Sequence, residues 1–169
     1  MDNPHRTVSV RIIIRLLVLV VLVPLLPLLI SWRWDWWEVW AYAILFILGF
    51  AVSGGLAARR HPDLIAERAR FTHHENDKPR DRRLVALVAL GLVLIPLVAG
   101  LDSRFGCSDP FSLPAKVLSL VLILAGYAWG TYALLENRFF SGVVRIQTER
   151  GHRVVSTGPY RWMRHPGYA

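Results

Sequence analysis

Long uncharged stretches constrain this chain more than any other feature of its sequence. An α-helix rises about 1.5 Å per residue, so roughly 20 apolar residues cross the ~30 Å hydrocarbon core of a bilayer. Four stretches have about this length, and they run from about Val10 to Ile30, Val39 to Ala58, Leu84 to Leu101 and Val117 to Leu135. The sequence therefore predicts an all-α fold, a polytopic membrane bundle with four transmembrane helices. We assign residues 1–136 to this transmembrane region and residues 137–169 to a cytoplasmic segment after it.

The first stretch must be distinguished from a secretory signal peptide, which also places a basic N-terminus before an apolar run. No cleavage site of small residues follows Ile30, and tryptophan-rich sequence comes next. Arg11 and Arg15 stand in its opening turns, where long side chains reach the headgroup region. We therefore expect an uncleaved first span.

Basic residues divide unequally between the two sides of such a bundle. Seventeen of the 20 Lys and Arg residues fall in the N-terminal tail, in the loop 59–83 and after Leu135, whereas Arg33, Arg104 and Lys116 fall on the other side. Cytoplasmic segments near membrane spans carry the positive excess. We expect an integral protein of a bacterial inner membrane, with both termini and the long loop in the cytoplasm.

The composition agrees with a lipid-embedded protein. Hydrophobic residues make up 54% of the chain and the mean hydropathy is +0.38, which is too apolar for an ordinary soluble domain. The net charge of +8 does not indicate a nucleic-acid partner, because the arginines lie between long apolar runs and not on one folded polar surface. A single cysteine, Cys107, excludes an intrachain disulfide, and we interpret it as a loop thiol.

Two local sequence patterns indicate membrane anchoring and helix packing, not binding or catalysis. Five of the seven tryptophans gather between the first two apolar stretches, and we interpret them as interfacial anchors in preference to a sugar-stacking surface: Trp32, Trp34, Trp36, Trp37 and Trp40. Gly126 and Gly130 form a GxxxG pattern in the last stretch, which predicts close approach of another helix.

The loop 59–83 offers a weak candidate for a metal site. Pro62 followed by Leu64 and further apolar residues predicts a short amphipathic helix on the inner leaflet. His73 and His74 lie beside acidic residues, but adjacent side chains point apart on any regular element and the spacing fixes no third ligand. We therefore predict no metal, and the role of this histidine pair stays open.

The last thirty or so residues differ in composition from everything before them, because polar and aromatic groups replace the aliphatic runs. Pro159 after Gly158 predicts a turn into a short helix, and Pro166 predicts the first residue of another helix. The N–H groups and positive dipole end of that second helix suit a carboxylate or phosphate beside His165. The alternative is a basic juxtamembrane segment that binds anionic headgroups.

From Gly158 to Tyr168 the sequence reads Gly-Pro-Tyr-Arg-x-x-Arg-His-Pro-Gly-Tyr. With the residues just before it, this stretch resembles the isoprenylcysteine carboxyl methyltransferase family and its phospholipid methyltransferase relatives. The resemblance implies S-adenosylmethionine as cofactor, held at the cytoplasmic face of the bundle. The cofactor-binding residues that it implies are Gln147, His152, Arg153, Val154, Val155, Tyr160, His165, Pro166, Gly167 and Tyr168.

Members of that family continue past this motif through further membrane helix, into a segment with an Arg and a Glu that help to bind substrate and cofactor. This sequence ends at Ala169, so we expect a truncated product or a fragment. The catalytic residues are accordingly not assigned.

The resemblance implies methyl transfer to a lipophilic acceptor, small or attached to a protein, that enters from the inner leaflet. A carboxylate acceptor needs no general base, whereas an amine must first lose a proton. No residue is a convincing base, which favours carboxyl O-methylation of the isoprenylcysteine type over phospholipid or amine N-methylation.

Two further classes are less well supported. A small membrane scaffold or transporter subunit is the non-enzyme alternative, but the last three apolar stretches lack the charged residues that mark transport paths. A nicotinamide-dependent reductase has no GxGxxG pattern to support it. The oligomeric state is not fixed by the sequence.

Overall fold

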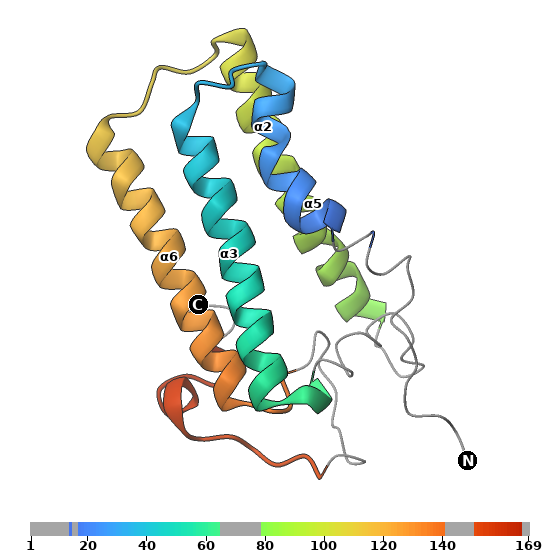
Figure 1. Cartoon of the computed structure of the whole chain (residues 1–169). Helices are drawn as coiled ribbons and strands as arrows, with labels where there is room; N and C mark the ends of the chain where they lie inside the picture. Colours follow the sequence, from blue (N-terminus) through green and yellow to red (C-terminus); the bar gives the residue numbers. More distant parts are fainter. Residues whose placement is uncertain (1–13, 15–16, 65–78, 141–150, 167–169) are drawn as a thin grey trace.

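The structure is a computed structural model that describes residues 14, 17–64, 79–140 and 151–166. Every regular element within these residues is helical, which agrees with the predicted all-α class. The elements are the π-helical turn η1 (Val18–Leu22), α2 (Val23–Ser31), α3 (Trp37–Arg60), α5 (Pro79–Phe105), α6 (Leu113–Glu136) and the short 3-10 helix η3 (Gly158–Arg161). In Figure 1 the long helices stand side by side.

Three helices among the described residues are long and apolar enough to cross a bilayer: the 24 residues of α3, the 20 residues of α5 from Ala86 onward and the 24 residues of α6. Large apolar side chains cover their outer surfaces. Ile44 on α3, Ile95 on α5 and Leu122 on α6 are each more than half exposed. Lipid tolerates such surfaces and water does not. The protein is therefore an integral membrane protein, as the sequence predicts.

The first predicted span is only partly covered by described residues. Within it, Val18–Ser31 is an apolar helix shorter than the other three. Pro27 is buried inside α2, and the Ser31 hydroxyl donates a 2.6 Å hydrogen bond to the Pro27 carbonyl. Because residues 10–13 and 15–16 lie outside the described residues, the fourth span stays a prediction.

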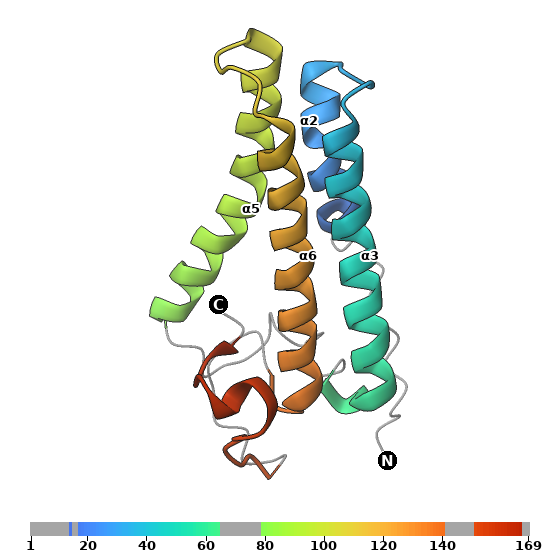
Figure 2. The same ribbon diagram turned by 90° about the vertical axis from the view of Figure 1, so that its left-hand side faces the viewer.

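Two helix pairs make up the bundle. α2 packs on α5, α3 packs on α6, and contacts between α2 and α3 join the pairs (Figures 1 and 2). The close approach of α5 to α2 depends on Gly100, because a Cβ there would lie 3.0 Å from the Pro27 Cα. Between α3 and α6, the Tyr127 ring lies on Gly49, where a Cβ would lie 2.6 Å from the ring carbon Cδ1.

The GxxxG pattern of α6 does not make the close contact that it predicts. At Gly126 and Gly130, no described atom lies within 4 Å of an added Cβ. α6 instead meets α3 through Tyr127 and through a hydrogen bond between the hydroxyls of Ser53 and Thr131. Small residues permit close packing only where a partner helix faces them, and α3 faces another side of α6.

The two ends of the bundle differ. At the far end, the α2–α3 turn lies beside the α5–α6 connection, and Arg104 donates a 2.7 Å hydrogen bond to the Ile30 carbonyl (Figure 1). Exposed tryptophans gather at this end, as an interfacial anchor requires: Trp32, Trp34, Trp37 and Trp40. At the opposite end, which we call the C-terminal end, the segment after α6 lies against the bundle.

Candidate functional site

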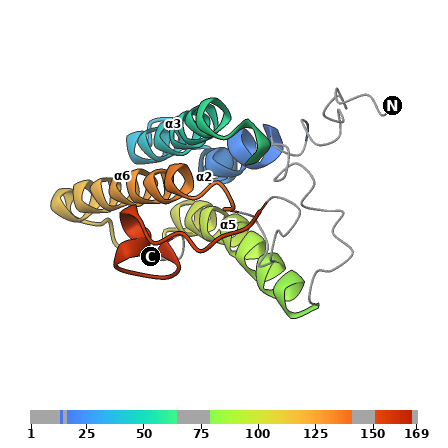
Figure 3. The same cartoon turned by 90° about the horizontal axis from the view of Figure 1, so that it is seen from below.

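The chain changes direction directly after α6. Asn137 leaves the helical conformation; its carbonyl accepts a 3.0 Å hydrogen bond from the Phe140 N–H, and its side-chain oxygen accepts one of 2.9 Å from the Phe139 N–H. A short amide side chain that bonds its own backbone favours such a turn over a further helical turn. η3 and the described residues after it lie against α6, on the side of α5 (Figures 2 and 3).

The turn predicted at Gly158 and Pro159 is present and begins η3. Gly158 has a φ of 55°, in the left-handed region that favours glycine. A Cβ there would lie 2.9 Å from Cγ of Glu136 and 3.1 Å from the Tyr132 hydroxyl oxygen. Pro159 is fully buried. A glycine at this position therefore lets η3 lie directly on the last turns of α6.

Two aromatic side chains fasten the segment to α6. The Tyr160 hydroxyl donates to the Ala133 carbonyl over 3.4 Å, and the Trp129 indole N–H donates to the Pro166 carbonyl over 3.1 Å. The Trp162 ring stacks on Trp129 with 6.4 Å between ring centroids and 18° between the planes. Positions 129 and 133 are one helical turn apart, so the anchors lie on one face of α6.

Burial shifts the pKa of Tyr160 further from neutral pH. The half-buried ring raises the pKa of the phenol above its ordinary value of 10.0, against a smaller opposing effect of a hydrogen bond with Asn137. Tyr160 is therefore a neutral phenol at physiological pH. It offers an aromatic face and a hydroxyl, not a negative charge.

His152 packs on the turn after α6. Its ring stacks on Phe139 with 4.8 Å between centroids and 11° between planes, and the Arg138 guanidinium lies 5.5 Å from the centroid of the same Phe139 ring. Arg138 also forms a 3.1 Å ion pair with Asp63, from the chain just after α3. The turn thus joins the C-terminal segment to the end of α3 as well as to α6.

The start of the loop 59–83 packs into the bundle. Residues 62–64 are helical, as Pro62 predicts, and the rest of that predicted helix lies outside the described residues. Leu64 is fully buried against Ala57 and Leu134, and the His61 Nε2 lies 2.9 Å from the Leu135 carbonyl oxygen. This first turn therefore contacts protein, where the sequence predicted a helix resting on lipid. The burial of Leu64 against helix ends explains the difference.

The predicted cofactor-binding residues fall into three groups. Tyr160 and Pro166 come together on α6, with the exposed His165 beside Pro166, while His152 lies on Phe139. Arg153 and Val154 are exposed and Val155 is half-buried. The remaining residues lie outside the described part of the chain: Gln147, Gly167 and Tyr168. His73 and His74 lie outside it too, and the described residues contain no cluster of metal-ligating side chains.

Comparison with known proteins identifies relatives of the C-terminal end of the chain. Residues 117–169 match the model of the isoprenylcysteine carboxyl methyltransferase (ICMT) family. Over 53 residues the chain is 38% identical to probable protein-S-isoprenylcysteine O-methyltransferases of Oryza sativa subsp. indica and subsp. japonica, and the match covers 31% of this chain. The chain thus spans 28% of the length of these curated relatives, and no solved structure matches it.

The isoprenylcysteine carboxyl methyltransferase match coincides with one packed unit of the structure. It covers α6 from residue 117 and all the described residues after it, which are the residues that the Tyr160, Trp129 and Gly158 contacts hold together. The upstream helices α2, α3 and α5 lie outside the match.

Sequence reasoning missed the contribution of α6 to this site. Trp129, Tyr132 and Glu136 form the surface on which the C-terminal segment lies. The sequence does contain a pattern that indicates this surface, because the three residues recur at spacings of three and four and so share one helix face. Length and apolarity predict a membrane span from Val117 to Leu135, but they do not show that one face of it carries the C-terminal segment.

Proposed function

We propose that this protein is an integral membrane methyltransferase that methylates the carboxylate of a lipophilic acceptor, of the isoprenylcysteine type, with S-adenosylmethionine as methyl donor. The observation that supports it most directly is the coincidence of the family match with the unit formed by α6 and the C-terminal segment. The arrangement of a bilayer-spanning bundle beside a polar segment suits a substrate that is part lipid and part charged group.

The residues of this unit are chemically suited to the donor. The described residues after α6 carry four arginines, which would attract its carboxylate: Arg138, Arg153, Arg161 and Arg164. His165, at the predicted start of a helix, adds a donor for the same group. Tyr160, as a neutral phenol, offers an aromatic face to a sulfonium. We propose that the full set also includes Gln147 and Tyr168, together with the residues around them that the family resemblance implies.

S-adenosylmethionine supplies a methyl group already activated by its sulfonium. The protein then has to orient the donor against the acceptor and exclude water from between them. Anchoring of η3 on α6 fixes Tyr160 and His165 relative to the membrane-spanning helices. A carboxylate acceptor is an anion at neutral pH and needs no proton removed, so we assign no general base.

We further propose the four-span arrangement, with both termini in the cytoplasm of a cell with a bacterial-type inner membrane. The concentration of basic residues at the C-terminal end supports this orientation. The acceptor then approaches from the inner leaflet.

The function can be tested in membranes that contain the protein, incubated with methyl-labelled donor and an S-prenylated cysteine bearing a free carboxylate. We expect label in a base-labile methyl ester. Base-stable label in phospholipid would instead indicate amine N-methylation and overturn the proposal.

Cofactor binding is measured separately by calorimetry on the detergent-purified protein. We expect His165→Ala to weaken binding of S-adenosylmethionine by about tenfold, the loss of one charge-assisted or strong hydrogen bond. His73→Ala, in the loop, is the matched control and should leave the affinity unchanged. Equal affinities for both variants and the unaltered protein would exclude His165 from the site.

A further inference from the structure

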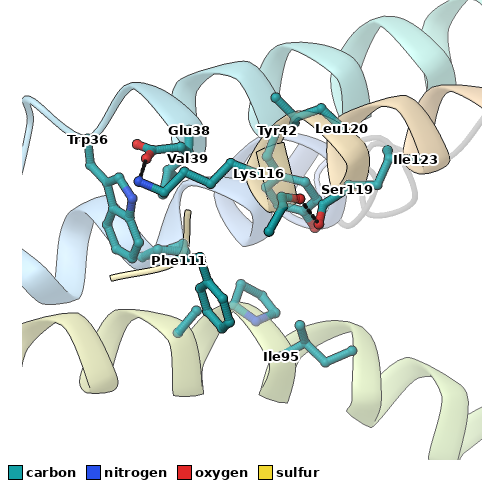
Figure 4. A pocket seen from close by; sticks show the side chains of 14 residues that line it. Trp36, Glu38, Val39, Tyr42, Ile95, Phe111, Lys116, Ser119, Leu120 and Ile123 are labelled. Carbon is teal, nitrogen blue, oxygen red and sulfur yellow. Dashed lines mark hydrogen bonds and ion pairs between the residues drawn. The ribbon is translucent and has the colours of Figure 1, made fainter. Parts of the chain in front are cut away.

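A second site lies at the far end of the bundle, away from the C-terminal segment. A cavity of about 400 Å³ opens there between α5 on one side and α3 with α6 on the other (Figure 4). Its size falls within the range of roughly 300–1,000 Å³ that small-molecule sites occupy. Apolar side chains form most of its wall, among them Val39, Tyr42, Ile95, Pro96, Leu120 and Ile123.

The position of this cavity restricts what can fill it. α3, α5 and α6 carry exposed apolar surfaces along this half of the bundle, so the surroundings are lipid chains. An apolar cavity of this kind does not hold water, because a buried water needs two to four polar partners. Hydrocarbon from the surrounding leaflet is therefore the natural occupant.

The rim of the cavity adds a charged group at a defined depth. Lys116, in the first turn of α6, forms an ion pair with Glu38 in the first turn of α3, and Trp36 lies beside them (Figure 4). The exposed tryptophans of the α2–α3 turn place this level at the membrane–water interface. A headgroup phosphate lies at that depth when its chains enter the hydrocarbon.

Lys116 is suited to such a phosphate. An ammonium group has three N–H donors, and among the described residues Glu38 is its ion-pair partner. The Lys116 side chain is 29% exposed, so donors remain accessible from the membrane side. The adjacent carboxylate of Glu38 complements an ammonium headgroup in the same way.

We propose that this cavity binds one phospholipid of the far-end leaflet, with an acyl chain between α5 and α6 and the phosphate on Lys116. The ion pair favours a charged headgroup, and the apolar wall favours a hydrocarbon chain. A phospholipid offers both in one molecule. The proposal is independent of methyl transfer, because the cavity and the C-terminal segment lie at opposite ends of the bundle.

Binding of the acyl chain in the cavity is tested in lipid nanodiscs. The probe is a phosphatidylethanolamine that carries a photoreactive diazirine within its acyl chain. We expect label on peptides that contain Ile95 to Ala99 and Lys116 to Ile123. Ala99→Phe fills the cavity, and displacement of several methylenes should lower this label at least about tenfold. Val98→Phe adds the same bulk at an exposed neighbour outside the cavity and should not change it. Equal labelling of both variants, or label spread evenly over all helices, would overturn the proposal.

The headgroup contact is tested with Lys116→Gln, which keeps a polar side chain one atom shorter and removes the charge. We expect labelling by the phosphatidylethanolamine probe to fall several-fold, while a diacylglycerol with the same photoreactive chain labels as before. If labelling falls equally for both probes, or falls for neither, the result contradicts the contact between the phosphate and Lys116. S-adenosylmethionine binding serves as the check on folding, since Ala99 and Lys116 lie at the far end of the bundle, away from the C-terminal segment.

Discussion

At the scale of single residues, Gly158 decides whether the C-terminal segment can lie on α6. Alanine there meets two penalties, the left-handed φ of 55° and contacts as short as 2.9 Å with Glu136. Gly151 has a similar φ of 64° but no described atom within 4 Å of an added Cβ, so among the described residues alanine there meets only the backbone cost of ~1–2 kcal/mol. The comparison of the two variants isolates the contact with α6.

We expect Gly158→Ala to release η3 from α6 and to speed tryptic cleavage after Arg161 and Arg164 by about tenfold, with a parallel loss of S-adenosylmethionine affinity. Gly151→Ala should be cleaved at nearly the rate of the unaltered protein. Limited proteolysis followed by mass spectrometry measures the rates. Equal rates for both variants would mean that the short contacts at Gly158 do not hold the segment.

At the scale of elements, the pairing of α2 with α5 depends on Gly100. A methyl group there would lie 3.0 Å from the backbone of α2 at Pro27, which cannot move as a flexible side chain can. Gly91 lies on the same helix, and no described atom lies within 4 Å of a Cβ added there. Glycine is less favourable than alanine within a helix by about 1 kcal/mol. Gly91→Ala should therefore be neutral or stabilising. Gly100→Ala should destabilise the bundle, although it brings the same gain in helix propensity.

Thermal unfolding in detergent distinguishes these two variants. We expect Gly100→Ala to unfold at a lower temperature than the unaltered protein and Gly91→Ala at the same or a higher temperature. If both shift in the same direction, helix propensity dominates and close packing at Gly100 is not important.

The elements themselves were largely predictable, whereas their contacts were not. Length and apolarity were sufficient for α3, α5 and α6, because a bilayer imposes both requirements on any spanning helix. The turn at Gly158 was predictable because glycine and proline restrict the backbone locally. The burial of Leu64 and the anchors on Trp129 depend on which faces meet in three dimensions. Spacing along one chain does not contain that information, and the GxxxG prediction for Gly126 and Gly130 failed for the same reason.

At the scale of the whole molecule, the bundle separates two kinds of chemistry by the thickness of a membrane. The C-terminal end gathers arginines and the C-terminal segment, while the far end carries Trp32, Trp34, Trp37, Trp40 and the Glu38–Lys116 pair. The helices between them offer mostly apolar side chains. The proposed methyl-donor site and the proposed lipid site lie at these two ends, so the orientation of the bundle decides which side of the bilayer each one faces and is the property to test.

Cys107 permits that test without a foreign label site, because it is the single cysteine of the chain, is exposed and lies in the α5–α6 connection at the far end. If the basic C-terminal end is cytoplasmic, a membrane-impermeant maleimide added to intact cells should label Cys107. The matched control is Ser156→Cys in a Cys107→Ser background, which moves the thiol to an exposed position in the C-terminal segment. This second thiol should react only after the membrane is permeabilised. Labelling of Ser156→Cys but not of Cys107 in intact cells would reverse the orientation and place the methyl-donor unit outside the cytoplasm.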